Sequence, residues 1–316
     1  MRRFFEWVLS LSMMVAGAGA VSGQDYPNKP IRVVTVAVGG GMDIVSRMIA
    51  PVITGSWGQP LIIDNRGNSA AEIASRAPPD GYTLLGEGAS FWIGPLLQAA
   101  PYDAVRDFSP ITLTTSTPGI LVVHPSVAAK SVKELIALAK ARPGELNYSA
   151  GSIGSSTHLS AELFKAMAGV DIARINYKGG AAALNAVLGG EVQVTFAGSG
   201  GMAAHIKSGR LRVLAVTSAE PSALMPGVPT VAASGVPGYE ASSVLAMFTP
   251  AKTPAAIINR LNQEIVRALN RADVKDNLFN LGLEVVSGTP QQLAAKMKSD
   301  MVKWGKVIKD AGIKAD

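Results

Sequence analysis

The amino-acid sequence predicts an α/β fold with two lobes. Apolar strand patterns alternate with helical patterns along most of the chain, which is typical of α/β proteins with largely parallel sheets. The β-branched run at 31–36 is followed by three glycines and then by apolar residues at helical spacing over 44–53. The same order of strand, small-residue loop and helix returns at 146–167. This repetition indicates two lobes, each a mostly parallel sheet flanked by helices, joined by two crossing strands.

Each expected element carries its own signal. Short runs of apolar or β-branched residues predict strands at 31–36, 61–63, 83–85 and 146–149. Pro51 lies inside the first helical pattern, where a proline is expected to kink or shorten a helix. Three later helices have a capping residue as their start signal, namely Ser131 with Glu134, Thr253 before Pro254, and Thr289 with Gln292. The last helix is expected to run to about Lys309.

The first two dozen residues have the pattern of a secretory signal peptide. Arg2 and Arg3 precede a short apolar run at 8–20, and 18–20 is a small-x-small cleavage site. Because the run is too short to span a bilayer, we expect residues 1–20 to be removed on export, with Gly23 as the alternative cleavage point. The competing interpretation is an amphipathic or buried N-terminal helix. The chain has no Cys, so we expect neither a lipid anchor nor a disulfide.

Composition narrows the class of function. With 48% hydrophobic and 16% charged residues, the chain is able to bury a large core. No second apolar run is long enough for a membrane anchor. The formal net charge of +6 suits an anionic ligand. The basic residues are scattered and match no nucleic-acid motif, so we expect no nucleic-acid partner. The lack of Cys and the wide spacing of the three His residues argue against a metal site, and we expect no cofactor.

Two loops of small residues, one in each half of the chain, are candidate anion sites. Gly39 to Asp43 precede the first helix, and Ser152 to Thr157 precede a helix in the second half. Free N–H groups at a helix start, together with the helix dipole, favour an anion there. The second loop lacks the Gly-Lys-Ser/Thr ending of a nucleotide P-loop, so we do not expect ATP. The ordinary alternatives are a tight turn and a helix cap with spare serines. We expect both loops to close on one small anion.

Other single residues are weaker candidates for contact with a ligand. Trp92 is the aromatic residue expected to touch the ligand, with ordinary packing as its alternative. Lys178 follows Tyr177 between an expected strand and an expected helix. At that position a lysine lies either near an anion or in solvent.

A hydrolase is the enzymatic alternative. The sequence has no Gly-x-Ser-x-Gly elbow. Ser156 and His158 would have to act as nucleophile and base, and no carboxylate partner for His158 is evident. We therefore expect His158 to be a hydrogen-bonded structural residue, as we do for His124 and His205, and we expect no catalytic residue.

From Tyr26 to the C-terminus the chain resembles the substrate-binding proteins of tripartite tricarboxylate transporters, also called Bug receptors. No single segment is decisive, but their order over nearly the whole mature chain is specific. The matching segments are 26–32, 39–45, 65–66, 79–83, 101–103, 122–126, 147–148, 158–159, 177–179, 214–218, 228–231 and 303–309.

The resemblance implies a periplasmic solute receptor with a periplasmic-binding-protein-like fold. Such a protein is a monomer that closes over a small carboxylate and delivers it to the membrane subunits of a tripartite transporter. The resemblance places the carboxylate between Gly40–Asp43 and Ser152–Thr157, partly through ordered waters. From the sequence we expect the chain to cross between lobes near 123–127 and to return near 241–249. The resemblance also implies that the final helices rejoin the first lobe, which assigns 24–124 with 247–316 to lobe 1 and 125–246 to lobe 2.

The sequence departs from the family pattern where the pocket is expected. The Pro-Phe-rich lead into the first loop is replaced by 36–38, the stretch after Arg66 is shortened, and usual polar residues are replaced by Gly94 and by Ala197-Gly198. We therefore infer a ligand with one carboxylate and an apolar or aromatic remainder, stacked on Trp92. A sensor that presents its bound form to a membrane kinase stays open as an alternative. The expected ligand-binding residues are Gly40, Gly41, Met42, Asp43, Asn65, Ser90, Trp92, Ser152, Ser155, Ser156, Thr157, Tyr177, Lys178 and Ser199.

Overall fold

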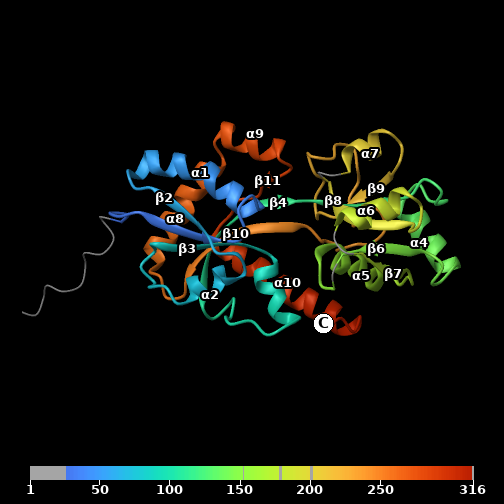
Figure 1. Ribbon diagram of the computed structural model, residues 1–316, viewed down its shortest axis with the longest axis horizontal. Helices are drawn as coiled ribbons and strands as arrows, with labels where there is room; N and C mark the ends of the chain where they lie inside the picture. Colours follow the sequence, from blue (N-terminus) through green and yellow to red (C-terminus); the bar gives the residue numbers. More distant parts are fainter. Residues whose placement is uncertain (1–25, 152, 178–179, 200–201, 315–316) are drawn as a thin grey trace, which may run out of the picture.

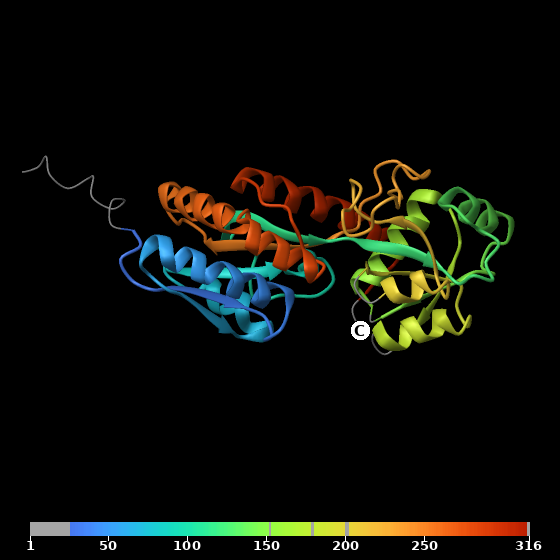
Figure 2. The same cartoon turned by 90° about the horizontal axis from the view of Figure 1, so that it is seen from above.

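Two lobes lie side by side along the long axis of the molecule, each with its own sheet (Figures 1 and 2). The structure is a computed structural model that describes residues 26–151, 153–177, 180–199 and 202–314. The expected two-lobed α/β fold is confirmed. The expected signal peptide at 1–20, with its alternative cleavage point at Gly23, lies outside the described residues, as do Ser152 and Lys178.

Lobe 1 is built on a six-stranded sheet in the order β11-β4-β10-β3-β1-β2. Its strands are β1 (Ile31–Thr35), β2 (Leu61–Asn65), β3 (Thr83–Gly88), β4 (Phe108–Thr117), β10 (Ser243–Pro250) and β11 (Glu284–Val285). Neighbouring residues of a strand pack on opposite faces of this sheet, as Leu84 and Leu85 do. One face carries α1 (Gly41–Trp57), α8 (Ala255–Leu269) and α9 (Ala272–Asn280). The other carries α2 (Ala70–Ser75), α3 (Ser90–Ile93) and α10 (Pro290–Asp310), with the short 3-10 helices η1 (Gly67–Ser69) and η2 (Gly94–Leu96) beside them.

Lobe 2 is built on a five-stranded sheet in the order β7-β6-β8-β5-β9. Its strands are β5 (Gly119–Val123), β6 (Asn147–Ala150), β7 (Ala173–Asn176), β8 (Val194–Gly198) and β9 (Arg212–Val216). Phe164 and Phe196 belong to the core on the face covered by α4 (Val132–Ala141) and α5 (Ser156–Ala168). Val187 and Met202 belong to the core on the opposite face, beside α6 (Gly180–Leu188) and α7 (Ala203–Lys207).

Both sheets are mixed, which corrects the expectation of mostly parallel sheets. In lobe 1, β2, β1 and β3 are parallel, whereas β10, β4 and β11 pair antiparallel. In lobe 2, β7, β6 and β8 are parallel, whereas β5 pairs antiparallel with β8 and β9. The physical reason is the connectivity. The parallel strands are joined by helical crossovers. The strand β5, in contrast, continues directly from β4 into lobe 2 and runs antiparallel to its neighbours β8 and β9.

The chain leaves lobe 1 at Pro118, the single residue between β4 and β5. A proline has no N–H to give to a ladder, so it suits the point where one sheet ends and the next begins. The crossing predicted at 123–127, and with it the lobe boundary at 124, therefore lies too late. On the return, Ala241 still bonds Thr217 of lobe 2, whereas Ser243 already pairs with Thr117 of lobe 1. The second boundary thus precedes the predicted residue 247.

The helix starts follow the sequence signals with one exception, Thr253. The Ser131 hydroxyl accepts from the Glu134 N–H at 3.2 Å, and Thr289 with Gln292 forms the expected capping box. Thr253 does not cap α8, because its hydroxyl donates to the Pro250 carbonyl at 2.8 Å and the helix begins two residues later.

The helix α1 runs through Pro51 to Trp57, so the proline expected to kink or shorten this helix does not end it. Pro51 is exposed, so water is able to satisfy the carbonyl that the proline leaves without a donor. Among the described helices, none is long and apolar enough to cross a membrane.

We expect Thr289→Ala to lower the free energy of unfolding by about 1 kcal/mol, because it removes a side-chain acceptor at the start of α10. The control is Lys298→Ala on the exposed side of the same helix, which is expected to change stability by less than about 0.5 kcal/mol. Urea unfolding followed by circular dichroism measures both values. Equal effects of the two substitutions would contradict the capping role.

Candidate functional site

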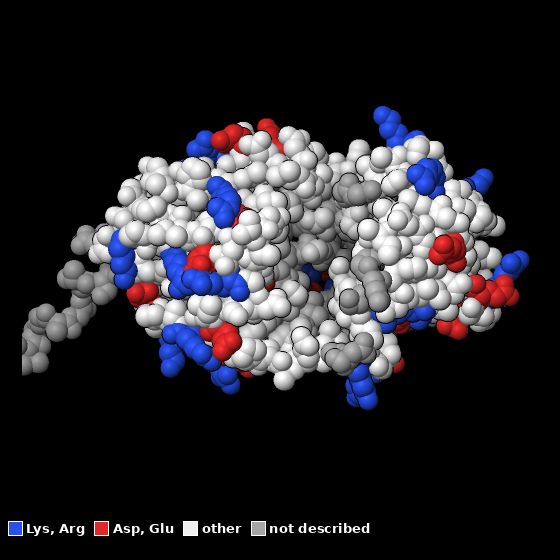
Figure 3. All heavy atoms as spheres, in the orientation of Figure 1, with Lys and Arg blue, Asp and Glu red and all other residues white. Residues whose placement is uncertain are grey.

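A cavity of about 440 Å³ lies where the two lobes meet, and Figure 3 shows the hollow between them. Its walls come from four parts of the fold: the start of α1, the turn after β3 with α3, the start of α5, and α10 with the segment that leads into β10. The first and third of these are the two small-residue loops singled out in the sequence. The structure therefore brings both candidate anion sites to one cavity.

The start of α1 presents backbone donors to the cavity. Gly40 caps the helix, and Gly41 and Met42 line the cavity. The N–H groups of a first helical turn have no partner inside the helix, so those of Gly41 and Met42 are available to a ligand. A Cβ on Gly41 would lie 2.9 Å from Leu245 Cδ1, so a larger residue would displace the cavity wall. Gly39 has a φ of 78°, a backbone conformation that favours glycine.

Asp43 and Asn65 hold this loop in shape and do not line the cavity. The Asp43 carboxylate accepts from the Gly39 N–H at 2.9 Å, from Arg47 Nε at 2.9 Å and from Asn65 Nδ2 at 3.0 Å. Burial raises the pKa of Asp43, but the hydrogen bonds from Arg47, Gly39 and Asn65 outweigh it and bring the pKa below its ordinary value. Asn65 also donates to the Val36 carbonyl at 3.0 Å. Both residues, expected as ligand contacts, support the residues that line the cavity.

The start of α5 forms the opposite wall. Gly154, Ser155 and Ser156 line the cavity. Ser155 caps the helix by accepting from the His158 N–H, and its hydroxyl lies 3.1 Å from that of Thr157. Thr157 Oγ1 also accepts from the Gly151 N–H at 3.2 Å, so these two hydroxyls shape the loop. Ser156 is exposed and also lines two smaller cavities beside the first, of about 60 and 270 Å³. Its N–H and hydroxyl are the ones best placed for a ligand.

His158 has the structural role expected of it. The ring is buried, and its Nδ1 accepts from the Gly154 N–H at 3.0 Å. Burial and, after it, the positive charge of Arg174 lower the pKa of His158 to about 4. A neutral ring whose Nδ1 already accepts a hydrogen bond is not arranged to take a proton from Ser156. The geometry therefore gives no support to the hydrolase alternative.

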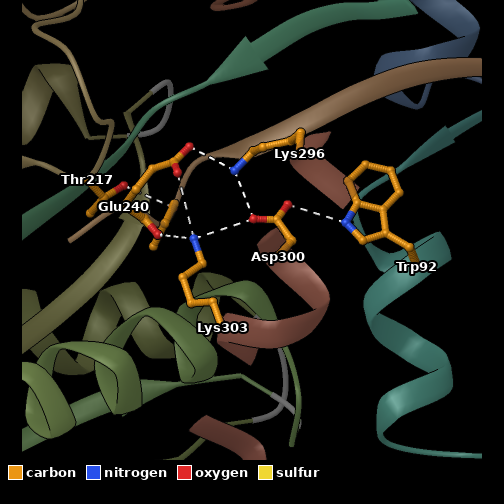
Figure 4. A network of polar contacts seen from close by, with 7 residues as sticks. Trp92, Thr217, Glu240, Lys296, Asp300 and Lys303 are labelled. Atoms are coloured by element: carbon orange, nitrogen blue, oxygen red, sulfur yellow. Dashed lines mark hydrogen bonds and ion pairs between the residues drawn. The ribbon is translucent and has the colours of Figure 1, made fainter. Parts of the chain in front are cut away.

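A network of charged groups forms the floor of the cavity, and the sequence analysis missed it (Figure 4). Lys296 lies between Asp300 and Glu240, with Nζ 2.9 Å from an oxygen of each. Lys303 donates to the Glu240 carbonyl at 2.8 Å and lies 3.5 Å from Asp300. The only sequence signal is that 296, 300 and 303 share one face of a helix, a pattern that exposed helices also show.

Trp92 belongs to this network, which corrects the expectation that it stacks on a ligand. Its ring is fully buried, its centroid lies 6.1 Å from that of Phe248, and its Nε1 donates to Asp300 at 3.3 Å. The ring does not line the cavity. A tryptophan that follows a turn signal packs inward here because α10, distant in sequence, covers it.

The remaining expected contacts divide into two groups. Ser90 is exposed and lines the cavity. Tyr177 and Ser199 do not: the Tyr177 N–H bonds the Ala150 carbonyl at 2.9 Å, and Ser199 is buried. A further residue that the sequence analysis missed is Glu87, which is buried in the cavity wall.

Comparison with known proteins connects this geometry to a family. The model described as "Tripartite tricarboxylate transporter family receptor" matches residues 45–313. The chain belongs to this family. BugT of Bordetella pertussis (strain Tohama I) is 34% identical over 316 residues, covering 97% of both chains. A protein from the tcbD-tcbE intergenic region of Pseudomonas sp. (strain P51) is 31% identical over 98% of this chain and 94% of its own length.

Solved structures of relatives agree with the fold. The structure described as R. palustris Rpa4515 with adipate is 34% identical, with a TM-score of 0.71, and covers 92% of this chain and 100% of its own. MatC from Rhodopseudomonas palustris with bound malate is 26% identical, with a TM-score of 0.65, and covers 90% of this chain and 100% of its own. The family inferred from the sequence is confirmed.

We expect His158→Asn to reduce the loss of stability in acid. The folded-state pKa of about 4 lies below the ordinary value of 6.5, so the unfolded chain binds the proton more tightly. Stability from this group is present above about pH 6.5 and falls by up to roughly 3 kcal/mol as the pH drops to about 4. Asparagine keeps an acceptor for the Gly154 N–H without titrating.

The measurement is urea unfolding of wild type and variant at several pH values, with His124→Gln as the control. The comparison at each pH is the readout, because Glu87, whose pKa burial raises to about 7, changes stability in the opposite sense in the same range. Parallel pH profiles of wild type and His158→Asn would contradict the expectation.

Proposed function

We propose that the chain is a periplasmic receptor that captures a small carboxylate between its lobes and delivers it to the membrane subunits of a tripartite transporter. The observation that carries this proposal is that two helix starts, one from each lobe, line a single cavity. Helix starts carry partial positive charge and unpartnered N–H donors, and both features favour an anion. Family membership and the relatives solved with adipate and malate support the same class of ligand.

The N–H groups of Gly41 and Met42 from lobe 1, and the N–H and hydroxyl of Ser156 from lobe 2, bind the carboxylate in this proposal. A hydrogen bond to a charged group contributes about 1.5 to 3 kcal/mol. Donors from both lobes bond one carboxylate fully only when the lobes approach each other. Ligand binding therefore favours the closed state by rotation about β4 and β10.

The rest of the cavity selects the remainder of the ligand. Its walls include Ile93, Leu97, Leu159, Leu245 and Trp304. These side chains favour an apolar portion next to the carboxylate, as inferred from the lost polar positions in the sequence. The face of Trp92 is not part of this selection. In this proposal the receptor acts as a monomer in the periplasm after removal of residues 1–20, with Gly23 as the alternative cleavage point.

The test is thermal unfolding of refolded, ligand-free protein against a panel of mono-, di-, tricarboxylic and aromatic acids. An acid at about one hundred times its Kd adds roughly 2.7 kcal/mol to the free energy of unfolding, so its melting temperature rises. No rise with any acid would overturn the carboxylate receptor.

Deletion of the gene tests the delivery step and is expected to abolish uptake of the stabilising acid. Retained uptake with lost gene induction would instead favour a sensor.

We expect Ser156→Asp to weaken binding of that acid by at least about tenfold, or about 1.4 kcal/mol. The new carboxylate occupies the helix start and repels the ligand. The same charge is favourable to the helix dipole by about 0.3 to 1 kcal/mol, so the melting temperature of the ligand-free variant is expected to stay the same or rise. Ser156→Asn, similar in size but neutral, is the control. Calorimetric titration that gives equal Kd values for the two variants would place the anion elsewhere.

A further inference from the structure

Glu87 is a buried carboxyl group in the cavity wall that the proposed carboxylate site does not use. It is 9% exposed and lies one residue before the end of β3. Leu85, two residues earlier, belongs to the core beneath α3 and α10, so the alternation of the strand places Glu87 on that side of the sheet. There it lines the same cavity as Ser90, Lys296 and Asp300. The strand is otherwise apolar or glycine from Leu84 onward.

The carboxylate of Glu87 has little compensation from the protein. It accepts a hydrogen bond from the N–H of the next residue, Gly88, at 3.3 Å. Among the described residues, no cation lies within ion-pair distance of it. Burial raises the pKa of Glu87 to about 7, against the Gly88 hydrogen bond, which lowers it. A buried charge without a partner is costly, so a ligand that supplies the partner gains what the protein lacks.

The charged groups around Glu87 are already paired with one another. On α10, Lys296 contacts Glu240 and Asp300, and Lys303 contacts the Glu240 carbonyl. Asp300 also accepts from Trp92. Tyr102, whose pKa rises by burial and by the nearby Glu87, donates its hydroxyl to the Phe91 carbonyl at 3.1 Å. The cavity thus offers donors at the helix starts and one uncompensated negative group at Glu87.

We propose that Glu87 binds an ammonium group at the far end of the ligand, so that this receptor selects an amino-carboxylate over a dicarboxylate of equal length. The inference rests on the proposed function, since the carboxylate end is held at the starts of α1 and α5. An ammonium group satisfies the Glu87 carboxylate by a charge-assisted hydrogen bond. A second carboxylate at that point meets a like charge, which disfavours binding. A ligand that ends in a methyl group has no charge to interact with Glu87, so its affinity is the reference for the other two.

The test uses matched triplets of acids that differ only at the far end. One is 6-aminohexanoate, adipate and hexanoate; a shorter one is 4-aminobutanoate, succinate and butanoate; an aromatic one is 4-(aminomethyl)benzoate, terephthalate and 4-methylbenzoate. Calorimetric titration at about pH 8, where Glu87 is ionised, is expected to show the amino member of at least one triplet binding about tenfold tighter than its diacid. Glu87→Gln is expected to remove this preference and to change the affinity for the methyl member by less than about threefold.

A second readout needs no substitution. As the pH falls from about 8 to about 6, protonation of Glu87 is expected to lower the affinity for the amino member several-fold relative to the methyl member. The ammonium groups of the ligands stay charged in this range. Burial lowers the pKa of Lys296, but its pairing with Asp300 and Glu240 outweighs burial and raises that pKa above its ordinary value. This measurement tests the inference on wild-type protein whether or not Glu87→Gln folds.

Three outcomes overturn the inference: diacids that bind as tightly as amino acids in every triplet, an unchanged preference in Glu87→Gln, or an affinity ratio that does not vary with pH. If mono- or dicarboxylates bind but the amino members show no preference, the inference on Glu87 fails and the proposed carboxylate receptor stands. If no member of any triplet binds and no acid of the wider panel raises the melting temperature, both fail together.

Discussion

The pairing of β4 with β10 is the constraint on which the binding cavity depends. The two strands pair from Phe108 opposite Pro250 to Thr117 opposite Ser243. Both connections to lobe 2 therefore leave lobe 1 at the same end of this strand pair. The helix α10 adds a second connection between the lobes, because its Lys296 and Lys303 bond Glu240, which lies in the segment that leads from lobe 2 into β10 (Figure 4). Buried ion pairs add little net stability, but loss of one partner leaves an uncompensated charge. The network therefore specifies where α10 lies, and with it the floor of the cavity.

The two helix starts that face the cavity depend on polar groups behind them. In lobe 1, Asp43 collects hydrogen bonds from the loop, from Arg47 and from Asn65. In lobe 2, His158 accepts from the Gly154 N–H, and Thr157 accepts from the Gly151 N–H. These hydrogen bonds hold the described residues of both loops in place, so fewer conformations have to be lost on binding of a ligand. Two of the residues expected to contact the ligand, Asp43 and Asn65, have this supporting task.

Local patterns predicted the fold well, because periodicity and capping are properties of neighbouring residues. The two strand-loop-helix repeats and the capping box at Thr289 follow from such patterns. The convergence of the two loops on one cavity is a contact between distant segments, and the family resemblance implied it. Contacts between distant segments were not predictable in the same way. Trp92 is buried because α10 covers it. The sheet changes at Pro118 because β4 pairs with β10 in lobe 1 and β5 pairs with β8 in lobe 2. Among the described residues, Glu87 has no ion-pair partner because the nearby lysines pair with other groups.

The net positive charge of the chain does not give the cavity an excess of positive charge. The formal net charge is +6, yet the two lysines that line the cavity are neutralised by Asp300 and Glu240. Glu87 adds a negative group to the same space. In the proposed function, the attraction for a carboxylate therefore comes from backbone N–H groups and helix dipoles, which act only within about one helical turn. An interaction of such short range requires a specific position for the carboxylate. A carboxylate bound there would leave the far end of the ligand to be selected by Glu87 and the apolar walls, as proposed above.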